Sequence, residues 1–314
     1  MANPDSAIHP ASPKARRTLV LGVVGGSGLY DLDGLTAVET RELHTPYGTP
    51  SGPYTCGELP RPGLAPLRVV FLARHGAGHL HLPGEINYRA NIHGFKQLGV
   101  THLVSVSAVG SLQPEIAPGH LVVPDQFIDR TRGRAGTFFG DGIVAHVQLG
   151  DPMCEGLRAR LLAAATAQGQ QPGGPVIHDG GICMVMEGPA FSTRAESNLY
   201  RSWGASVIGM TGMPEAKLAR EAEMSYALLA CSTDYDCWHA SEEEVTVEAV
   251  VAVMRRNVAA ARQVVARLAE SLPETTEALP YPRALEHAIL TDLRKIPAAT
   301  RKRIDLIAGH YLRS

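Results

Sequence analysis

Apolar runs rich in β-branched residues alternate with helix-like stretches along most of this chain of 314 residues. Short apolar runs of this kind are typical of buried strands, whereas apolar positions spaced three and four apart are typical of helices. Strands are predicted at residues 18–24, 67–73, 102–108, 120–125, 181–186, 205–210 and 225–231. Strands that alternate with helices predict an α/β fold, a sandwich of helices around a largely parallel sheet.

The helix signals fit the same alternation. Thr193 and Glu196 have the spacing of a capping box, as do Ser241 and Glu244, and Pro214 suits the first turn of a helix. Further helices are predicted at 87–99 and 151–169. The capping box at Ser241 predicts a long helix that runs to about residue 270. Because no polar linker interrupts the pattern before about residue 272, we expect one domain at 18–271. We also expect a disordered arm at 1–17 and a helical extension at 272–314.

The bulk composition excludes several classes of function. The formal net charge is −2, which gives no electrostatic footprint for nucleic acid or for an anionic membrane surface. The five cysteines are odd in number and form no CxxC pair, which is typical of reduced thiols in a cytoplasm. The first seventeen residues contain no apolar stretch long enough for a signal peptide, and no segment of the sequence reaches the length of a membrane span. We therefore expect a cytoplasmic protein that binds neither nucleic acid nor membrane.

Small or polar residues directly follow five of the predicted strands. The five segments are GGSG (25–28), ARHG (73–76), SAVGS (107–111), GMTGMP (209–214) and STDYD (232–236). In open α/β sheets, ligands bind beyond the carboxyl ends of the strands. The sequence therefore predicts that these five segments converge on one crevice.

The first segments offer groups that suit an anion. Glycines at 25–28 let backbone N–H groups approach an anion closely, and Ser27 and Ser107 add hydroxyl donors. Arg74 supplies a planar fork of donors for phosphate oxygens, and His75 stands beside it. The glycine run completes neither a dinucleotide fingerprint nor a Walker A loop nor a nucleophile elbow. An ordinary strand–turn, a surface arginine and a core histidine remain the alternative interpretation.

A metal site is a second alternative for this region. His75, His79 and His81 lie close together in RHGAGHLHLP, and zinc hydrolases gather histidines at such spacings. Arg74 would repel a cation at the first of them, and no further ligands are evident. A metal-dependent hydrolase is therefore kept only as a rival to a metal-free enzyme.

Asp234 and Asp236 stand two residues apart after the last strand. On an extended segment such residues face the same side. Two carboxylates held close cannot both ionise cheaply, so one of them keeps its proton to higher pH. The pair could thus supply one hydrogen-bond acceptor and one acid, unless it is a solvated turn.

Several separate strings agree with one known family. They are GVVGGSGLYD, TPYGTPSG, LARHGAGHLHLPGEINYRANI, DQFIDRT, EGPAFSTRAES, GMTGMPEAKLARE and STDYDCW. In this order and spacing they resemble the purine nucleoside phosphorylase family, and within it the branch that acts on 5′-methylthioadenosine. The resemblance runs from about residue 18 to 268.

The resemblance implies a three-layer phosphorylase-like fold with a mixed sheet, and a pentosyltransferase of purine and methionine salvage. Such an enzyme cleaves 5′-methylthioadenosine with inorganic phosphate to adenine and 5-methylthioribose 1-phosphate. It implies phosphate as co-substrate, no cofactor and no metal, and a homotrimer with sites at subunit boundaries.

The resemblance also assigns site residues. Implied phosphate ligands are Ser27, Arg74, His75, Ser107, Ala108 and Thr211. Implied substrate contacts are Phe191, Ser192, Met210, Thr233, Asp234, Asp236, His79, His146, Val247, Val250 and Val251. His146 is expected to come from a neighbouring subunit, and the three valines to surround the methylthio group. Asp234, Asp236 and Ser192 are the catalytic candidates.

The charges of the reaction suggest roles for these groups. Cleavage builds positive charge on the sugar, which bound phosphate can stabilise, and negative charge on the purine, which an acid at N7 can neutralise. We expect Asp234 to be that acid and Asp236 to support it, although the two roles could be exchanged. A carboxylate also suits the 6-amino group of adenine better than a 6-oxo group.

The segment after Thr211 departs from this pattern. Gly212 and Met213 resemble the branch that cleaves methylthioinosine, so methylthioinosine or another purine nucleoside is an alternative substrate. A module that binds nucleosides without consuming phosphate is a nonenzymatic alternative.

Overall fold

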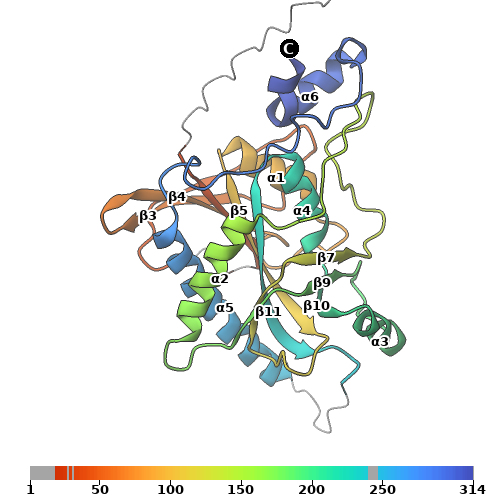
Figure 1. Cartoon of the computed structure of the whole chain (residues 1–314). Helices are drawn as coiled ribbons and strands as arrows, with labels where there is room; N and C mark the ends of the chain where they lie inside the picture. Colours follow the sequence, from red (N-terminus) through yellow and green to blue (C-terminus); the bar gives the residue numbers. More distant parts are fainter. Residues whose placement is uncertain (1–17, 27, 30–31, 240–246, 314) are drawn as a thin grey trace, which may run out of the picture.

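The structure is a computed structural model that describes residues 18–26, 28–29, 32–239 and 247–313; the side chains of 247–251 lie outside that description. Its centre is an 11-stranded sheet with the path β2-β3-β4-β1-β5-β10-β9-β7, to which β11, β6 and β8 are added (Figure 1). The strands are β1 (Leu21–Gly25), β2 (Thr36–Arg41), β3 (Tyr54–Arg61), β4 (Leu64–Ala73), β5 (His102–Ser111), β6 (Leu121–Val123), β7 (Gln126–Asp129), β8 (Ile177–Asp179), β9 (Ile182–Val185), β10 (Ala205–Gly209) and β11 (Ser225–Tyr235).

The sheet is mixed and largely parallel, as the sequence predicts. β1 pairs in parallel with β4 and β5, β5 with β11, β9 with β10 and β7, and β6 with β8. The antiparallel pairs are β2–β3, β3–β4, β5–β10 and β6–β11.

At their carboxyl ends, β5 and β11 run at least three residues further than predicted. β5 continues past residue 108 to Ser111, and β11 continues past residue 231 to Tyr235. The extra residues pair with each other, with Gly110 opposite Asp234 and Ser111 opposite Tyr235, and Gly110 also pairs with Ile208 of β10. These ladder hydrogen bonds keep polar, glycine-containing segments extended although their composition resembles turns.

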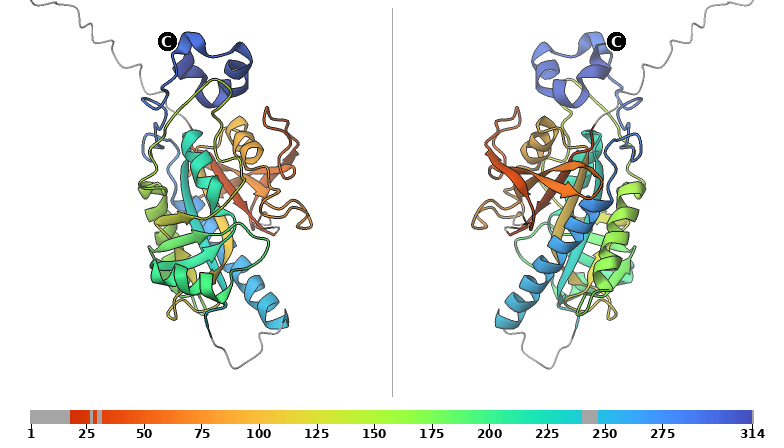
Figure 2. Two further views of the ribbon diagram at one scale, coloured as in Figure 1. Left: turned by 90° about the vertical axis from the view of Figure 1, so that its right-hand side faces the viewer. Right: turned by 90° about the vertical axis from the view of Figure 1, so that its left-hand side faces the viewer.

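Helices cover both faces of the sheet in three layers. The helices are α1 (Tyr88–Gln97), α2 (Glu155–Gly169), α3 (Arg194–Ser202), α4 (Gly212–Glu221), α5 (Val247–Ser271) and α6 (Ala298–Ala308). One core lies between the sheet and the layer of α1, α4 and α6, and a second lies between the sheet and α2 with α5. The right-hand view of Figure 2 shows α2 and α5 side by side along their face.

The capping box at the start of α3 is confirmed, because Thr193 and Glu196 bond reciprocally to each other's backbone. The second expected box, at Ser241 and Glu244, lies outside the described residues.

The C-terminal stretch ends in α6, at the top of Figure 1, which packs against α1. Its apolar side chains, among them Leu285, Ile304 and Ile307, join the same core as α1 and α4. The expected division at residue 272 stays a prediction, as does the disordered arm at 1–17, which lies outside the described residues.

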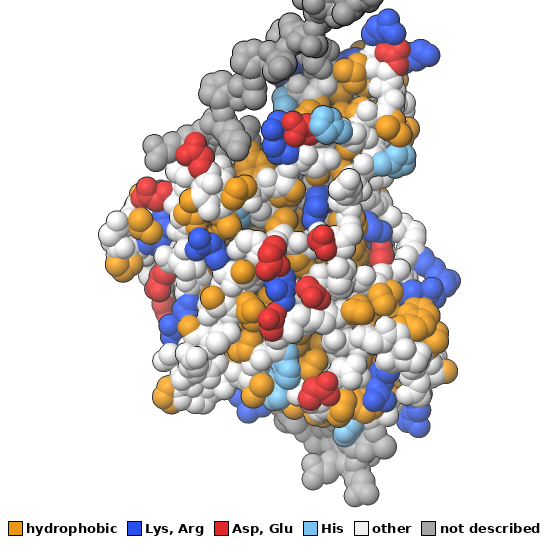
Figure 3. Space-filling model, viewed as in Figure 1, with side chains coloured by type: hydrophobic (Ala, Val, Ile, Leu, Met, Phe, Trp, Pro, Cys, Tyr) orange, Lys and Arg blue, Asp and Glu red, His pale blue; other side chains and the backbone are white. Residues whose placement is uncertain are grey.

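The surface mixes both signs of charge. On the face seen in Figure 3, acidic and basic side chains lie among one another without a large basic patch. In the described part of the chain, no helix combines the length and the apolar character needed to cross a membrane.

Candidate active site

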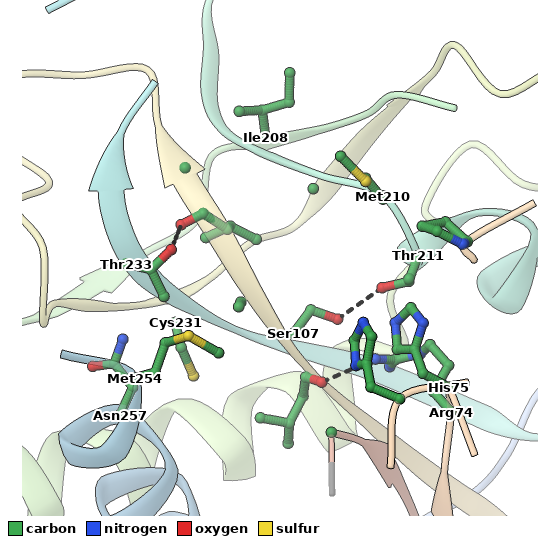
Figure 4. A pocket seen from close by; sticks show the side chains of 18 of the residues that line it. Arg74, His75, Ser107, Ile208, Met210, Thr211, Cys231, Thr233, Met254 and Asn257 are labelled. Carbon is green, nitrogen blue, oxygen red and sulfur yellow. Dashed lines mark hydrogen bonds between the residues drawn. The ribbon is translucent and has the colours of Figure 1, made fainter. Parts of the chain in front are cut away.

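The five predicted segments meet at one cavity of about 610 Å³. Its lining includes Gly26, Arg74, Ser107, Thr211 and Asp234, which is one residue from each segment. Figure 4 shows Thr233 on one side of this cavity and Arg74, His75 and Thr211 on the other. The hypothesis that Arg74 and Asp234 serve a single ligand required a shared cavity, and the structure provides it.

Arg74 lines the cavity with only 2% of its surface exposed. Its Nε donates to Oε1 of Glu215 at 2.5 Å, and its Nη2 lies 3.3 Å from Oε2 of the same carboxylate. Further donations to the carbonyls of Val24 and Val106 fix the plane of the guanidinium. The fork is therefore held rigidly in place before any ligand arrives.

Glu215 is a site residue that the sequence did not reveal. It sits in the first turn of α4, is 2% exposed, and also accepts a 2.9 Å hydrogen bond from Ser105 Oγ. Burial alone would lower the pKa of Arg74, but the charge and hydrogen bond of Glu215 outweigh it and hold that pKa above its usual value. Arg74 thus stays charged in its buried position.

Two buried hydroxyls lie next to each other in the cavity wall. Ser107 Oγ and Thr211 Oγ1 lie 3.1 Å apart, and both residues line the cavity (Figure 4). Thr211 is the N-cap residue of α4, yet its side chain makes no capping hydrogen bond to the helix. Its hydroxyl is thereby available to the cavity, and Ala108 lines the cavity beside Ser107.

His75 enters the same end as a neutral ring. Burial lowers its pKa to about 4, and its Nδ1 lies 2.8 Å from the carbonyl oxygen of His81. Its ring stacks on that of His79 with centroids 4.2 Å apart. Because the rings lie face to face and Nδ1 has a partner, the arrangement does not favour joint coordination of a metal. No group of three or more metal-ligating side chains is found within the described ranges.

The acid pair lies on the other side of the cavity, where Asp234 has an unusual environment. Burial raises its pKa, and the charge of Asp236 acts in the same direction, while the Thr233 hydroxyl opposes them. Thr233 Oγ1 lies 2.6 Å from Asp234 Oδ2 and 3.2 Å from the carbonyl oxygen of Val109. A hydroxyl has one proton, so it can donate to only one of them at a time. A protonated Asp234 satisfies both contacts, because it can donate to Thr233 while Thr233 donates to Val109.

Asp236 is more deeply buried, at 7% exposed, and its Oδ2 has no hydrogen-bond partner among the described residues. Its backbone N–H donates to the carbonyl of Ser111 at 3.0 Å, and the indole Nε1 of Trp238 donates to the same oxygen at 2.8 Å. Arg201 stacks on that indole at 3.7 Å. Asp236 also lines the cavity, so its carboxyl group stands in the same wall as that of Asp234.

Apolar side chains form the walls between the two ends. Met210 and Phe191 line the cavity as expected, and Phe191 is 80% exposed. Lining residues that the sequence did not suggest are Leu29, Leu80, Leu82, Met186, Ile208, Met254, Asn257 and Val258. Asn257 of α5 donates to the carbonyl of Ser232 at 2.8 Å, next to the acid-bearing segment.

The carbonyl groups of Met210 and Met213 are fixed by a buried arginine. Arg134 donates to them at 2.6 Å and 2.9 Å, and it pairs with Glu187 at 3.1 Å. The backbone on both sides of Thr211 is thereby held by a residue that does not line the cavity. This contact could not be predicted from the sequence, because Arg134 lies in an irregular segment with no helical or strand pattern.

Some of the expected site residues are not among the described residues that line the cavity. Ser192 does not line the cavity; its Oγ lies 3.4 Å from Met186 Sδ. His146 is exposed and absent from the lining of its own chain's cavity, which agrees with an expected role in a neighbouring subunit without testing it. Ser27 and the side chains of Val247, Val250 and Val251 lie outside the described residues.

Gly212 and Met213 do not face the cavity either. Met213 is 3% exposed and packs in the core beneath α4, and a Cβ on Gly212 would meet the Phe127 ring. The departure at these two positions therefore concerns packing and not the surface that a base would touch.

Comparison with known proteins identifies the family of the chain. The sequence profile described as "Phosphorylase superfamily" matches residues 20–270. The chain belongs to this superfamily. The matched range of this phosphorylase contains all the cavity-lining residues named above.

Individual relatives extend the likeness over nearly the whole chain. An S-methyl-5′-thioadenosine phosphorylase of Geobacter sulfurreducens is 54% identical over 93% of this phosphorylase and 99% of that relative. One of Synechocystis sp. is also 54% identical, over 93% of this chain and 87% of the relative.

Solved structures agree with the fold. The crystal structure of a methylthioadenosine phosphorylase from an antarctic soil metagenomic library has a TM-score of 0.83 at 42% identity, covering 93% of this chain and 99% of that one. The methylthioadenosine phosphorylase of Schistosoma mansoni in complex with adenine has a TM-score of 0.72 at 36% identity, covering 80% and 91%.

Proposed function

We propose that this phosphorylase cleaves 5′-methylthioadenosine with inorganic phosphate, releasing adenine and 5-methylthioribose 1-phosphate. The observation that carries the proposal is a single cavity with a rigid arginine and paired hydroxyls at one end and a carboxyl pair at the other. The relatives described above are named for the same substrate.

Phosphate binds at the end formed by Arg74, His75, Ser107, Ala108 and Thr211. There it faces the anomeric carbon, C1′, of the sugar. As the glycosidic bond lengthens, the anion stabilises the growing positive charge on the sugar and then forms the new C1′–O bond. The bonding electrons leave with the purine, whose N7 takes a proton from Asp234. Proton transfer from a positioned acid contributes about a hundredfold or more to such a step.

Adenine is the base that the acid pair fits best. Once Asp234 donates to N7, the carboxylate of Asp236, which lines the same cavity, can accept from the 6-amino group. A 6-oxo group would place an acceptor near that carboxylate, which is unfavourable. Methylthioinosine remains the second candidate substrate because of the sequence motif at 209–214. Two residues of that motif, Gly212 and Met213, nevertheless face away from the cavity.

We propose further that the enzyme is a cytoplasmic homotrimer. All five cysteines are free, in keeping with a reducing compartment. His146 is exposed beside the apolar side chains of Val144 and Leu290, which are 49% and 68% exposed. These features suit contact with a second copy, and a solution mass of three times 33.5 kDa is the test.

Purified protein should be incubated with 5′-methylthioadenosine, with and without phosphate, and the products identified. Adenine and a sugar phosphate should form only when phosphate is present, and a chelator should leave the rate unchanged. Adenine without a phosphate requirement, or loss of rate with chelator, would favour a hydrolase. Binding without turnover would favour a nucleoside-binding module. Faster cleavage of methylthioinosine than of methylthioadenosine would reassign the base.

A further inference from the structure

The described lining of the cavity carries one permanent positive charge. Arg74 is the one lysine or arginine among the described residues of the lining. Its guanidinium is paired with the Glu215 carboxylate through contacts of 2.5 Å and 3.3 Å, and both side chains are 2% exposed. In a setting this dry, the two opposite charges largely cancel as seen by a third group nearby.

Glu215 cannot easily move away from Arg74 when an anion enters. Its Oε2 accepts from Ser105 Oγ at 2.9 Å and lies 3.4 Å from the Tyr226 hydroxyl. Arg74 is equally fixed, because Nη2 donates to Ser105 Oγ and to the Val24 carbonyl. The ion pair therefore persists as a unit beneath the ligand.

Arg74 can still reach a ligand while it is paired. Nη1 carries two N–H groups, and the described residues supply one acceptor for it, the Val106 carbonyl at 3.2 Å. The second N–H is available to a phosphate oxygen. His75 adds no charge near neutral pH because its pKa is lowered to about 4. The end thus offers several hydrogen bonds but little net charge.

We propose that Glu215 keeps the phosphate end close to electrically neutral, so that bound phosphate retains its negative charge for the sugar cation. This proposal rests on the phosphorolysis proposed above. Glu215 acts through Arg74 and not on the substrate, so it is a positioning residue that sets the charge of the subsite.

The physical reason is differential binding. An arginine without its carboxylate would pair fully with phosphate, which stabilises the enzyme–phosphate complex before the reaction begins. The same pairing would draw phosphate charge away from C1′, where it is needed in the transition state. Interactions that favour the ground state over the transition state lower KM and kcat together.

The test is the isosteric variant Glu215→Gln. We expect KM for phosphate to fall about fivefold and kcat to fall about tenfold, the range of one charge-assisted hydrogen bond. Phosphate alone, without nucleoside, should raise the Tm of E215Q more than that of the wild type. A purely structural role would lower Tm and leave phosphate affinity equal or weaker.

Two further variants separate charge from shape. Glu215→Asp keeps the charge and shortens the side chain, so phosphate affinity should not rise. Glu221→Gln alters another buried glutamate of α4 that bonds to Thr137 and Phe138 away from the cavity, and phosphate affinity should stay at the wild-type value. If E215Q folds only in phosphate, the dependence of its Tm on phosphate concentration still measures the affinity.

Unchanged or weaker phosphate affinity in E215Q would overturn the inference, as would a similar gain in E215D. Failure of the proposed function looks different, because the wild-type enzyme would then not consume 5′-methylthioadenosine with phosphate at all.

Discussion

Gly212 packs so closely against Phe127 that an added Cβ would lie 2.6 Å from Cε1 of the ring. Phe127 belongs to β7 and packs against the core that also buries Met213. The unusual pair Gly212–Met213 is thus explained by the ring it accommodates. A larger residue after Thr211 requires a smaller residue at 127.

Replacing Gly212 by Ala should therefore destabilise the fold by about 1–3 kcal/mol, the usual cost of overpacking. Urea unfolding measures this loss, and F127L in the same chain should restore part of it. Gly136→Ala is the matched control, since its Cβ would meet nothing nearer than 3.6 Å. The preference for adenine over hypoxanthine nucleosides should be equal in G212A and wild type; a changed preference would contradict our assignment of Gly212 to packing.

The variant Asp234→Asn should lower kcat about a hundredfold or more, because the purine would leave without a proton at N7. KM for phosphate should change little, since Asp234 lies on the other side of the cavity. Steady-state kinetics with both substrates separate these effects. Asp236→Asn is the companion variant. A larger loss of kcat in D236N than in D234N would exchange the two roles.

The ionised form of Asp234 should also destabilise the folded state at neutral pH. Its pKa is raised by burial in the folded chain, so its contribution is fully present below the unfolded pKa and is lost as pH rises through the folded pKa. D234N should therefore have a higher Tm than the wild type near neutral pH, and the gap should close in acid. A Tm difference between D234N and the wild type that is equal at both pH values would mean that folding does not shift the pKa of Asp234, and would contradict this prediction.

Glu221 gives a second pH effect outside the cavity. Burial raises its pKa to about 7 although Phe138 N and Thr137 Oγ1 donate to it. Its contribution to the free energy of unfolding should thus fall as pH rises between about 5 and 8. Urea unfolding of wild type and E221Q across this range isolates the effect, because contributions of the buried histidines cancel in the difference. Parallel curves would contradict the raised pKa.

Much of the fold could be predicted because the buried strands carry a clear signal. β1, β4 and β5 lie where apolar β-branched runs predicted them, and α1 ends before Gly99. β2 was missed because all six of its residues are exposed, so it has no apolar face to detect. β7 and β8 are three or four residues long and only half buried, too short for a periodic pattern.

The site was predictable where function requires unusual residue types at strand ends. Arg74, Thr211 and the acid pair stood out for that reason, and all of them line the cavity. Glu215 and Asn257 did not stand out, because a glutamate in a first turn and an asparagine in a helix are common on surfaces. Their importance comes from burial at 2% and 4% exposure, which only tertiary packing determines.

The pairing of β5 with β11 sets the distance between the two halves of the reaction. Ser107 and the residue opposite Asp234, Gly110, are three positions apart on one continuous strand. At about 3.3 Å per residue, this stretch separates the Ser107 hydroxyl, at the proposed phosphate end, from the level of Asp234 by roughly 10 Å. Backbone hydrogen bonds between β5 and β11, and not side-chain contacts, therefore set the length of nucleoside that fits between the two ends. An insertion or deletion of one residue in this stretch would change the distance between the two ends for every substrate, even if all other lining residues were preserved.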